Sequence, residues 1–394
     1  MIRFLTAGES HGQALVVIIE GIPAGLPIAV EFIQGELARR RLGYGRGPRM
    51  RFEKDEVRLL SGIRHGRSLG SPIAIEITNT EWPKWETEMS SAPGLPTKPL
   101  KTPRPGHADL SGMLKYGFDD ARDVLERASA RETAARVAAG AIAKLFIAEI
   151  GIQIVSHVTS IGSVVANKGE LPTPSQLSVI DASEIRCLDP EIQEAMIAEI
   201  KAAAKDGDSL GGSVQVIAWG APVGLGSHVH WDRKLDARLA YSLMSIQAIK
   251  AVSIGDGIEV ASLRGSVAHD AIFWDSEKGD YVRDSHHAGG IEGGMTTGGP
   301  ISATVWMKPL ATLNRPVIQS VNVSSKESEM SFKERTDVIA VPAMGVVAET
   351  MMALVLADEA LRKFGGDSIA EFTRNHDSYM KSLGTTLSGP IAKS

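Results

Sequence analysis

Residues 1–20 read MIRFLTAGESHGQALVVIIE, an apolar run, a short polar segment and a second apolar run. Met1 to Ala7 is strand-like, and the valines and isoleucines of Leu15–Glu20 favour a buried strand. The segment between them, Gly8-Glu9-Ser10-His11-Gly12, holds a histidine among glycines, which allow a tight backbone and the close approach of a reacting ligand. An ordinary turn explains the same pattern. The functional reading gains weight from a second histidine beside a glycine, His107, which precedes further arginines.

The composition is that of an ordinary soluble globular protein, with 43% hydrophobic and 23% charged residues among 394. Lysine and arginine total 42 against 47 acidic residues, a net charge of −5, so any preference for polyanions must come from a local cluster. Cys187 is the only cysteine, which excludes an intrachain disulfide and indicates a reducing compartment. We find no secretory signal and no uninterrupted apolar run that could span a bilayer, and we therefore expect a cytoplasmic protein with no membrane partner.

Apolar periodicity predicts helices and strands that follow one another without a regular βαβ rhythm. The predicted helices are Phe32–Leu42, Thr133–Ile150, Pro190–Asp206, Asp232–Val252 and a buried Val346–Phe364. The predicted strands are Leu15–Glu20, Val57–Ile63 and Ile73–Thr78 around a turn at His65-Gly66, Ser213–Ala221, and Ile301–Met307. We predict an α+β fold in a single domain covering residues 1–394.

A long irregular arm separates the first strands from the alanine-rich helix. Residues 82–107 contain six prolines together with Trp82 and Trp85, and loops of this length are lids, binding loops or subunit contacts. Further along, Ser129-Ala130-Arg131-Glu132 matches a capping box, in which the serine and the glutamate satisfy backbone groups at a helix start.

Arginines are concentrated near the end of the first predicted helix. Six lie within thirteen residues, interleaved with Gly43, Gly45 and Gly47: Arg39, Arg40, Arg41, Arg46, Arg49 and Arg51. One interpretation is a solvated helix end whose charges suit the helix dipole. The other is that glycine lets guanidinium groups converge on a small polyanion, since arginine binds phosphate and carboxylate in bidentate fashion.

Two further segments carry candidate groups. Arg127 to Arg131 lies at a predicted helix start, where backbone N–H groups favour an anion, although a plain capped helix with solvated arginines fits as well. His107 lies two residues before Asp109, which can orient or charge-stabilise the imidazole for general acid work on a leaving phosphate. A structural histidine at a helix start is the alternative.

The remaining motifs are weaker. Residues 289–299 contain six glycines, but Gly289 to Gly294 does not spell GxGxxG, so the segment indicates either a wall against a planar ring or a surface loop. His228 and His230 are far along the chain from His286-His287, with no ligand spacing that completes a metal site, and we expect no metal. Arg335-Thr336-Asp337, taken alone, reads as a charged loop.

Taken in order, six segments resemble the chorismate synthase family, and the resemblance spans essentially the whole chain. They are Gly8–Gly12, Gly43–Gly47, Arg104–Asp109, Arg127–Arg131, Ala288–Gly294 and Arg335–Asp337. Two departures bear on flavin contacts and leave the histidines untouched. His286-His287 stands where members often carry asparagine, and Val338-Ile339 stands where many have a cysteine or a small polar residue.

The resemblance implies a β-α-β sandwich of antiparallel sheets packed around a helical core, assembled as a homotetramer. It implies a lyase that converts 5-enolpyruvylshikimate 3-phosphate to chorismate and phosphate, the last step of the shikimate pathway. The reaction is an anti-1,4-elimination that needs reduced FMN (FMNH2), with NADPH as a candidate reductant. Because no appended reductase domain is recognisable, we expect the chain to depend on an outside source of reduced flavin.

The resemblance also assigns residues. His11 protonates the flavin at its N1 edge, His107 protonates the departing phosphate, and Asp337 manages the proton at flavin N5. The substrate-binding residues are Ser10, Arg40, Arg46, Arg49, Ser129, Arg131 and Arg335. The FMN-binding residues are Arg40, Arg46, Arg127, Ala128, Ser129, Gln247, Ala248, Gly293, Lys308, Pro309, Leu310, Ala311, Thr312 and Arg335. Two alternatives remain, a polyanion- or RNA-binding protein that uses the Arg39–Arg51 cluster and a metal-dependent phosphatase.

Overall fold

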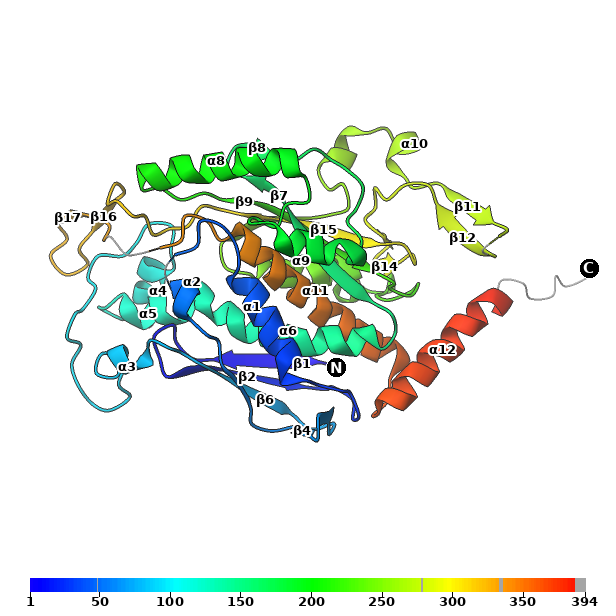
Figure 1. Ribbon diagram of the computed structural model, residues 1–394, viewed down its shortest axis with the longest axis horizontal. Helices are drawn as coiled ribbons and strands as arrows, with labels where there is room; N and C mark the ends of the chain where they lie inside the picture. Colours follow the sequence, from blue (N-terminus) through cyan, green and yellow to red (C-terminus); the bar gives the residue numbers. More distant parts are fainter. Residues whose placement is uncertain (48, 278, 333–335, 387–394) are drawn as a thin grey trace, which may run out of the picture.

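The computed structural model describes residues 1–47, 49–277, 279–332 and 336–386. Two antiparallel sheets are joined by packed helices, which confirms the predicted mixture of helices and antiparallel sheet (Figure 1). The first sheet has the order β1-β2-β6-β3, formed by Arg3–Ala7, Ala14–Glu20, Ile73–Thr78 and Val57–Leu59. The second has the order β10-β15-β9-β7-β8, formed by Ile249–Ile254, Ile301–Met307, Gly212–Trp219, Gln153–Ile161 and Val164–Val165.

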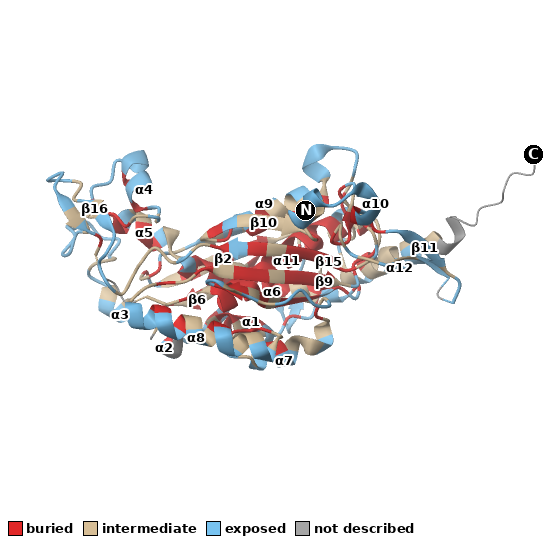
Figure 2. Ribbon diagram, turned by 90° about the horizontal axis from the view of Figure 1, so that it is seen from above, coloured by how far each residue is buried: buried red, intermediate tan, exposed pale blue. Residues whose placement is uncertain are grey.

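Four helices form the layer that contacts these sheets, namely α1 (Val30–Arg41), α6 (Thr133–Ala148), α9 (Leu235–Met244) and α11 (Val341–Phe364). Helix α6 packs on strands of the first sheet and α11 packs on strands of the second, and the two helices pack on each other. Figure 2 shows that buried residues concentrate along α6, α11 and the central strands. The alanines of α6 permit this close approach, and Gly140 lies directly against Thr350 of α11.

Helix α11 is buried along nearly its whole length, as predicted for Val346–Phe364, and it begins earlier, at Val341. Among the described residues it is the one helix with the length and composition of a membrane span, although Glu349 and Asp358 interrupt its apolar run. Its most apolar stretch lies entirely inside the molecule, which identifies α11 as a core helix.

Smaller elements surround this core. The helices are α2 (Arg49–Phe52), α3 (Trp82–Trp85), α4 (Asp109–Tyr116), α5 (Arg122–Ala128), α7 (Leu177–Ala182), α8 (Pro190–Asp206), α10 (Gly265–Ala268) and α12 (Ile369–Thr386). The 3₁₀ turns are η1 (Ala130–Glu132), η2 (Pro174–Gln176), η3 (Trp231–Arg233) and η4 (Glu259–Ser262). The two-stranded hairpins are β4–β5 (Ile63–Arg64, Arg67–Ser68), β11–β12 (Ile272–Asp275, Asp280–Arg283), β13–β14 (Ile291–Glu292, Met295–Thr296) and β16–β17 (Gln319–Val321, Ser328–Met330).

Helices α3, α4 and α5 and strand β16 gather at one end of the molecule in both views (Figures 1 and 2). There, Met113 of α4 and Leu125 of α5 form a small buried cluster with Ala121, separate from the main core. Phe332 packs against the same cluster. The α4–α5 pair therefore has packing of its own.

The prediction of a single helix over Asp232–Val252 is wrong in its second half. Leu235–Met244 is helical, but Ala248 adopts a φ of +67° in the turn that follows, and Ile249–Ile254 forms strand β10 against β15. The β-branched residues of this stretch complete the edge of the second sheet, and that pairing outweighs the helical spacing of the preceding leucines.

One other prediction needs adjustment and two are confirmed. The strand predicted over Val57–Ile63 is split into β3 and β4, because the chain turns at Gly62, where a Cβ would lie 2.6 Å from Ile73 Cγ1. The turn at His65-Gly66 is confirmed between β4 and β5. Helix Pro190–Asp206 is confirmed with the predicted bounds, and its N-cap is Asp189.

Candidate active site

The loop between β1 and β2 carries Ser10 and His11 and is tightly constrained at its start. Gly8 has a φ of +102°, and a Cβ at this position would lie 2.3 Å from the carbonyl oxygen of Ala14. Only glycine fits this backbone. The loop is also fixed at Ser10, whose backbone N–H donates to the carbonyl oxygen of Glu126 in α5 at 3.0 Å.

His11 is held on two sides. Its Nδ1 lies 2.9 Å from Oε1 of Glu126, and its backbone N–H donates to Oε2 of the same carboxylate at 2.8 Å. The indole of Trp85 stacks on the imidazole, with ring centroids 4.1 Å apart and planes inclined by 28°. Trp85 belongs to the proline-rich arm, so this arm supplies one wall for the histidine.

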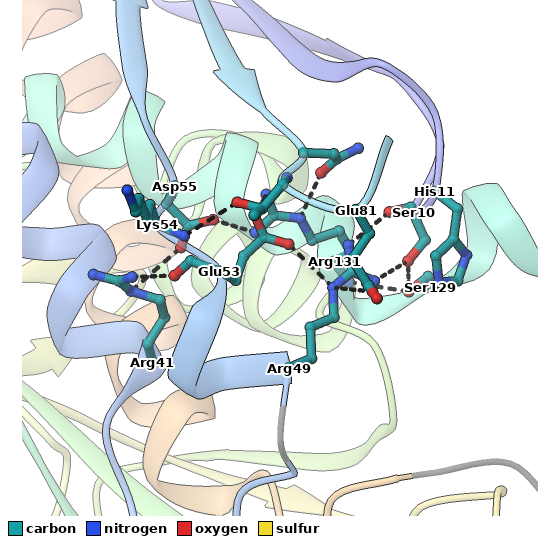
Figure 3. Close-up of polar contacts among 12 residues, drawn as sticks. Ser10, His11, Arg41, Arg49, Glu53, Lys54, Asp55, Glu81, Ser129 and Arg131 are labelled. Carbon is teal, nitrogen blue, oxygen red and sulfur yellow. Dashed lines mark hydrogen bonds and ion pairs between the residues drawn. The ribbon is translucent and has the colours of Figure 1, made fainter. Parts of the chain in front are cut away.

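Arginines surround two buried carboxylates next to this loop, as Figure 3 shows. Arg131 donates from Nε to Asn79 at 2.9 Å, contacts Asp55 through Nη1, and lies 3.6 Å from Glu53 through Nη2. Arg49 donates from Nη2 to the carbonyl oxygen of Ser10 at 2.8 Å and from Nη1 to its hydroxyl at 3.0 Å. The segment of Arg49, Glu53 and Asp55 thus contacts Ser10 through Arg49 and contacts Arg131 through its two carboxylates.

Two neighbouring arginines of α1 complete the cluster. Arg40 is buried, donates to Thr133 Oγ1 at 2.9 Å, and lies 3.9 Å from Asp55. Arg41 donates to the carbonyl oxygen of Glu53. Burial lowers the pKa of Arg40 to about 10, since the nearby charge of Asp55 offsets only part of the desolvation cost.

Glu53 is ionised in this setting. Burial alone would raise the pKa of its carboxyl group, but the charge of Arg131 and hydrogen bonds from Thr80 outweigh burial and hold the pKa below its ordinary value. The arginines still outnumber the two buried carboxylates. Several of their buried nitrogens have no hydrogen-bond partner among the described residues: Arg40 Nη1, Arg41 Nε, Arg46 Nε and Arg131 Nη2. Buried cationic N–H groups in this condition suit an anionic ligand.

The glycine-rich segment 43–47 joins this cluster to the residues before α11. Arg46 Nη1 lies 3.1 Å from Oδ2 of Asp337, and the backbone N–H of Gly47 donates to Oδ1 of the same carboxylate. The backbone of Gly45 pairs with that of Val338 at 2.8 Å. Arg335, predicted to bind substrate and flavin, lies outside the described residues, as does the side chain of Arg51.

Arg39, which was not among the predicted substrate-binding residues, does not join the cluster. It turns into the core and pairs with Glu349 of α11 at 2.8 Å, Glu36 at 2.9 Å and Asp181 at 2.7 Å. Because helical residues one apart point in different directions, Arg39 and Arg40 face different surroundings.

His107 has the carboxylate partner that the sequence predicted. Its Nδ1 hydrogen-bonds to Asp109 at the start of α4, and Arg104 donates to the other carboxylate oxygen at 2.9 Å. Burial would raise the pKa of Asp109, but the hydrogen bonds from His107 and Arg104 lower it to about 2. Asp109 is therefore an anion that fixes the ring.

The capping box at Ser129 is only half formed. Ser129 accepts a hydrogen bond from the backbone N–H of Arg131 at 3.2 Å, within the 3₁₀ turn η1 that precedes α6. Glu132 does not reach back to Ser129, because it binds Gln247 at 2.9 Å and Thr6 at 2.7 Å. The Ser129 hydroxyl instead lies 3.2 Å from that of Ser10, beside the arginine cluster.

The predicted flavin-binding residues lie around this cluster in several groups. Arg127 is half-exposed and donates to the carbonyl oxygens of Thr6 and Gly8 at 2.8 and 3.2 Å; Ala128 follows at the end of α5. Gln247 donates to Glu132, and its Oε1 is buried with no hydrogen-bond partner among the described residues. Ala248 accepts from the backbone N–H of Lys308 at 3.0 Å.

The segment that runs from Lys308 through Pro309, Leu310 and Ala311 to Thr312 lies against the His107 loop. Lys308 Nζ donates to the carbonyl oxygen of Gly106 at 2.8 Å, and Arg104 donates to Thr312 at 2.9 Å. Burial, followed by the charge of Lys250, lowers the pKa of Lys308.

Gly293 stands apart from these groups. It lies in the turn of the β13–β14 hairpin, and among the described residues no hydrogen bond or ion pair joins this hairpin to the arginine cluster. Gly289 and Gly290 are packed against the backbone of Gly255 and Pro300, so at these two positions the glycines serve internal packing. Of the four glycines between Gly289 and Gly294, only Gly293 has no atom within 4 Å of an added Cβ.

The described residues contain no group of three histidine, cysteine, aspartate or glutamate side chains that could hold a metal ion. His287 is instead paired with Asp256 at 2.6 Å.

Several site residues were missed at the sequence level. Glu53 and Asp55 follow the arginines directly, and their presence among so many cations was an available signal. No sequence signal pointed to Glu126 or Trp85, because their contacts with His11 depend on how the arm and α5 fold around the first loop.

Comparisons with known proteins agree over almost the full length. A family model described as chorismate synthase matches residues 2–361. Proteins named chorismate synthase from Streptomyces coelicolor and Salinispora tropica are each 56% identical to this chain, over 391 and 392 residues. These matches cover 97% of this chain, and 98% and 99% of the respective relatives. A solved structure described as a crystal structure of chorismate synthase is similar with a TM-score of 0.79 and 42% identity, covering 98% of both chains.

Proposed function

The chain belongs to the chorismate synthase family, and we propose that the cluster around Ser10, His11 and Arg131 is its active site. The protein is a lyase that converts 5-enolpyruvylshikimate 3-phosphate to chorismate and phosphate in the shikimate pathway. The observation that carries the location of the site is the group of buried guanidinium nitrogens without hydrogen-bond partners.

The charge of the substrate supports this location. A phosphate and two carboxylates give the substrate nearly four negative charges, which the arginines match although the whole chain is acidic. The proposed substrate-binding residues are Ser10, Arg40, Arg46, Arg49, Ser129, Arg131 and Arg335.

The surroundings of the cluster fit reduced FMN. The buried Gln247 Oε1 has no donor among the described residues. Lys308, whose pKa is lowered first by burial and then by the charge of Lys250, suits an anionic group. We propose that Arg127 to Ser129, Gln247, Ala248 and the segment Lys308–Thr312 hold the cofactor, with Arg40, Arg46, Gly293 and Arg335 as further contacts. Reduced FMN, when bound, supplies electron density to the substrate as phosphate leaves, and regains that electron density together with the hydrogen lost from the substrate ring.

The proton-handling residues are His11, His107 and Asp337. Each imidazole has a buried carboxylate at Nδ1, and we assign proton transfer to its Nε2. In His107, Arg104 Nη2 also lies 3.1 Å from Nδ1 and 3.5 Å from Nε2. His107 protonates the departing phosphate, and His11 holds the proton for the flavin N1 edge. Asp337, which pairs with Arg46 and accepts a hydrogen bond from the backbone N–H of Gly47, manages the proton at flavin N5.

The test is an anaerobic assay for chorismate with photoreduced FMN, repeated with oxidised FMN. We expect activity only with the reduced cofactor. His11→Ala and His107→Ala should each lower turnover by about 10²–10⁴ without loss of folding. His230→Ala, an exposed histidine away from the cluster, is the matched control and should behave as wild type. Wild-type rates in both active-site variants, or activity with oxidised FMN, would contradict the proposal.

Other expectations from the family remain proposals. They are a single domain with a β-α-β sandwich, a homotetramer measurable by light scattering, a cytoplasmic location, and a need for an outside flavin reductant, which an assay with NADPH and FMN alone tests. The RNA-binding alternative receives no support, since the relatives reported above are all named chorismate synthase.

A further inference from the structure

We infer that Glu126 is a positioning residue for His11, whose carboxylate keeps the hydrogen of the imidazole on Nδ1 and aims Nε2 at the reacting groups. This inference rests on the proposed role of His11 and adds a residue that the motifs did not indicate. Glu126 acts through the histidine and has no direct part in the chemistry.

Glu126 contacts the His11 loop through both its side chain and its backbone. The carboxylate accepts from the backbone N–H of His11 at 2.8 Å and lies 2.9 Å from Nδ1, while the carbonyl oxygen accepts from the N–H of Ser10 at 3.0 Å. These three bonds attach the loop to α5 at two successive residues. The imidazole therefore cannot turn over without breaking a charge-assisted hydrogen bond.

The opposite side of the histidine is closed by a chain of contacts that returns to Glu126. Trp85 stacks on His11, and the guanidinium of Arg122 lies 4.8 Å from the centre of the Trp85 ring. Arg122 also donates to Oε1 of Glu126 at 2.9 Å. Four side chains thus form a closed ring of contacts, which restricts both the position and the tilt of the imidazole.

The chemistry of the carboxylate determines the tautomer. An ionised carboxylate only accepts hydrogen bonds, so a neutral His11 beside Glu126 must carry its hydrogen on Nδ1. The charged groups around this pair are Arg122 of α5, Arg49 of α2 through Ser10, and four carboxylates that line the same cavity as Glu126, namely Glu9, Glu88, Asp120 and Asp123. Glu126 is the one negative group in contact with the ring among the described residues, and removing its charge disfavours the imidazolium.

Glu126→Gln tests this role, because it keeps the shape of the side chain and removes the charge. With reduced FMN under anaerobic conditions we expect kcat to fall by about 10- to 100-fold, the range known for groups that orient functional histidines, with little change in KM. We expect the alkaline limb of the pH profile of kcat/KM to move to lower pH by about one unit. Glu126→Asp should restore the position of that limb. Asp123→Asn removes an exposed carboxylate from the same helix and is the matched control.

A double-mutant cycle separates this role from general destabilisation. In the His11→Ala background, adding Glu126→Gln should lower kcat by a further factor of less than about two. The reason is that Glu126 acts through the imidazole, which this background lacks. Independent, multiplicative losses would overturn the inference, and so would a wild-type pH profile in Glu126→Gln.

A second measurement needs no variant at position 126. Nitrogen-15 histidine spectra of the wild-type protein, with the His11 signal identified by its absence in His11→Ala, should show the neutral ring protonated at Nδ1. A ring protonated at Nε2 would overturn the inference even if Glu126→Gln does not fold. An inactive wild-type enzyme with reduced FMN would instead refute the proposed function, and the tautomer would still report on Glu126.

Discussion

Replacing Gly140 by alanine tests the contact on which the helix layer depends. Gly140 of α6 faces α11, and a Cβ at this position would lie 2.2 Å from Cβ, 2.8 Å from Cα and 2.9 Å from the carbonyl oxygen of Thr350. Carbon atoms in ordinary contact are about 3.5–4.0 Å apart, so α6 and α11 must separate by about 1 Å. No rotation of the Thr350 side chain relieves the contacts with its backbone.

The size of the effect follows from two opposing contributions. Alanine is favoured over glycine in a helix interior by about 1 kcal/mol. Forcing an extra methyl group into a packed core costs about 1–3 kcal/mol, and contacts with backbone atoms place this case at the upper end. We therefore expect Gly140→Ala to lower the free energy of unfolding by about 2 kcal/mol.

The control is the same substitution where space is open. Gly35 lies inside α1, and no atom lies within 4 Å of its added Cβ, so Gly35→Ala should stabilise the protein by up to about 1 kcal/mol. Urea denaturation of both variants, followed by circular dichroism, gives the comparison. If Gly140→Ala is as stabilising as Gly35→Ala, the close approach of α6 and α11 described above is incorrect.

Three shorter predictions concern the site and the core. The pKa of Asp109 is about 2 in the folded protein, against an ordinary value of 3.8, so its ionised form contributes about 2 kcal/mol to the free energy of unfolding. This contribution is present above pH 4 and is lost as the pH falls toward 2. Asp109→Asn should flatten that part of a stability–pH curve. Arg131→Lys should raise KM for the substrate at least tenfold, because lysine cannot reproduce the contacts with Asn79 and Asp55, and a KM unchanged within twofold would exclude Arg131 from substrate binding. Burial raises the pKa of the Cys187 thiol, so a thiol reagent should modify it only after unfolding, and rapid labelling of the native protein would show that the site opens.

The sequence was most informative where a local pattern and its tertiary surroundings agree. Val346–Phe364 is apolar on most sides because both α6 and the second sheet cover it, and Pro190–Asp206 has an N-cap and a C-terminal glycine that mark its ends. Asp109 was found because it lies two residues from His107. These features need only neighbours in the chain.

Features that depend on distant partners could not be predicted in this way. The strand Ile249–Ile254 has apolar residues that continue the helical spacing of α9, and only its pairing with β15 decides its conformation. Arg39 and Arg40 are indistinguishable in sequence, yet one enters the core toward Glu349 and the other faces Asp55. Glu126 approaches His11 across more than a hundred residues of chain.

The small cluster of Met113, Ala121 and Leu125 determines which part of the site a substitution in α4 or α5 would affect first. Asp109 and Glu126, the carboxylates that contact the two imidazoles, lie on the helices that this cluster holds together, whereas Arg40, which we propose binds substrate, lies on α1 in the main hydrophobic body. Under the residue roles proposed above, loosening Leu125 would disturb proton delivery before it disturbed substrate capture.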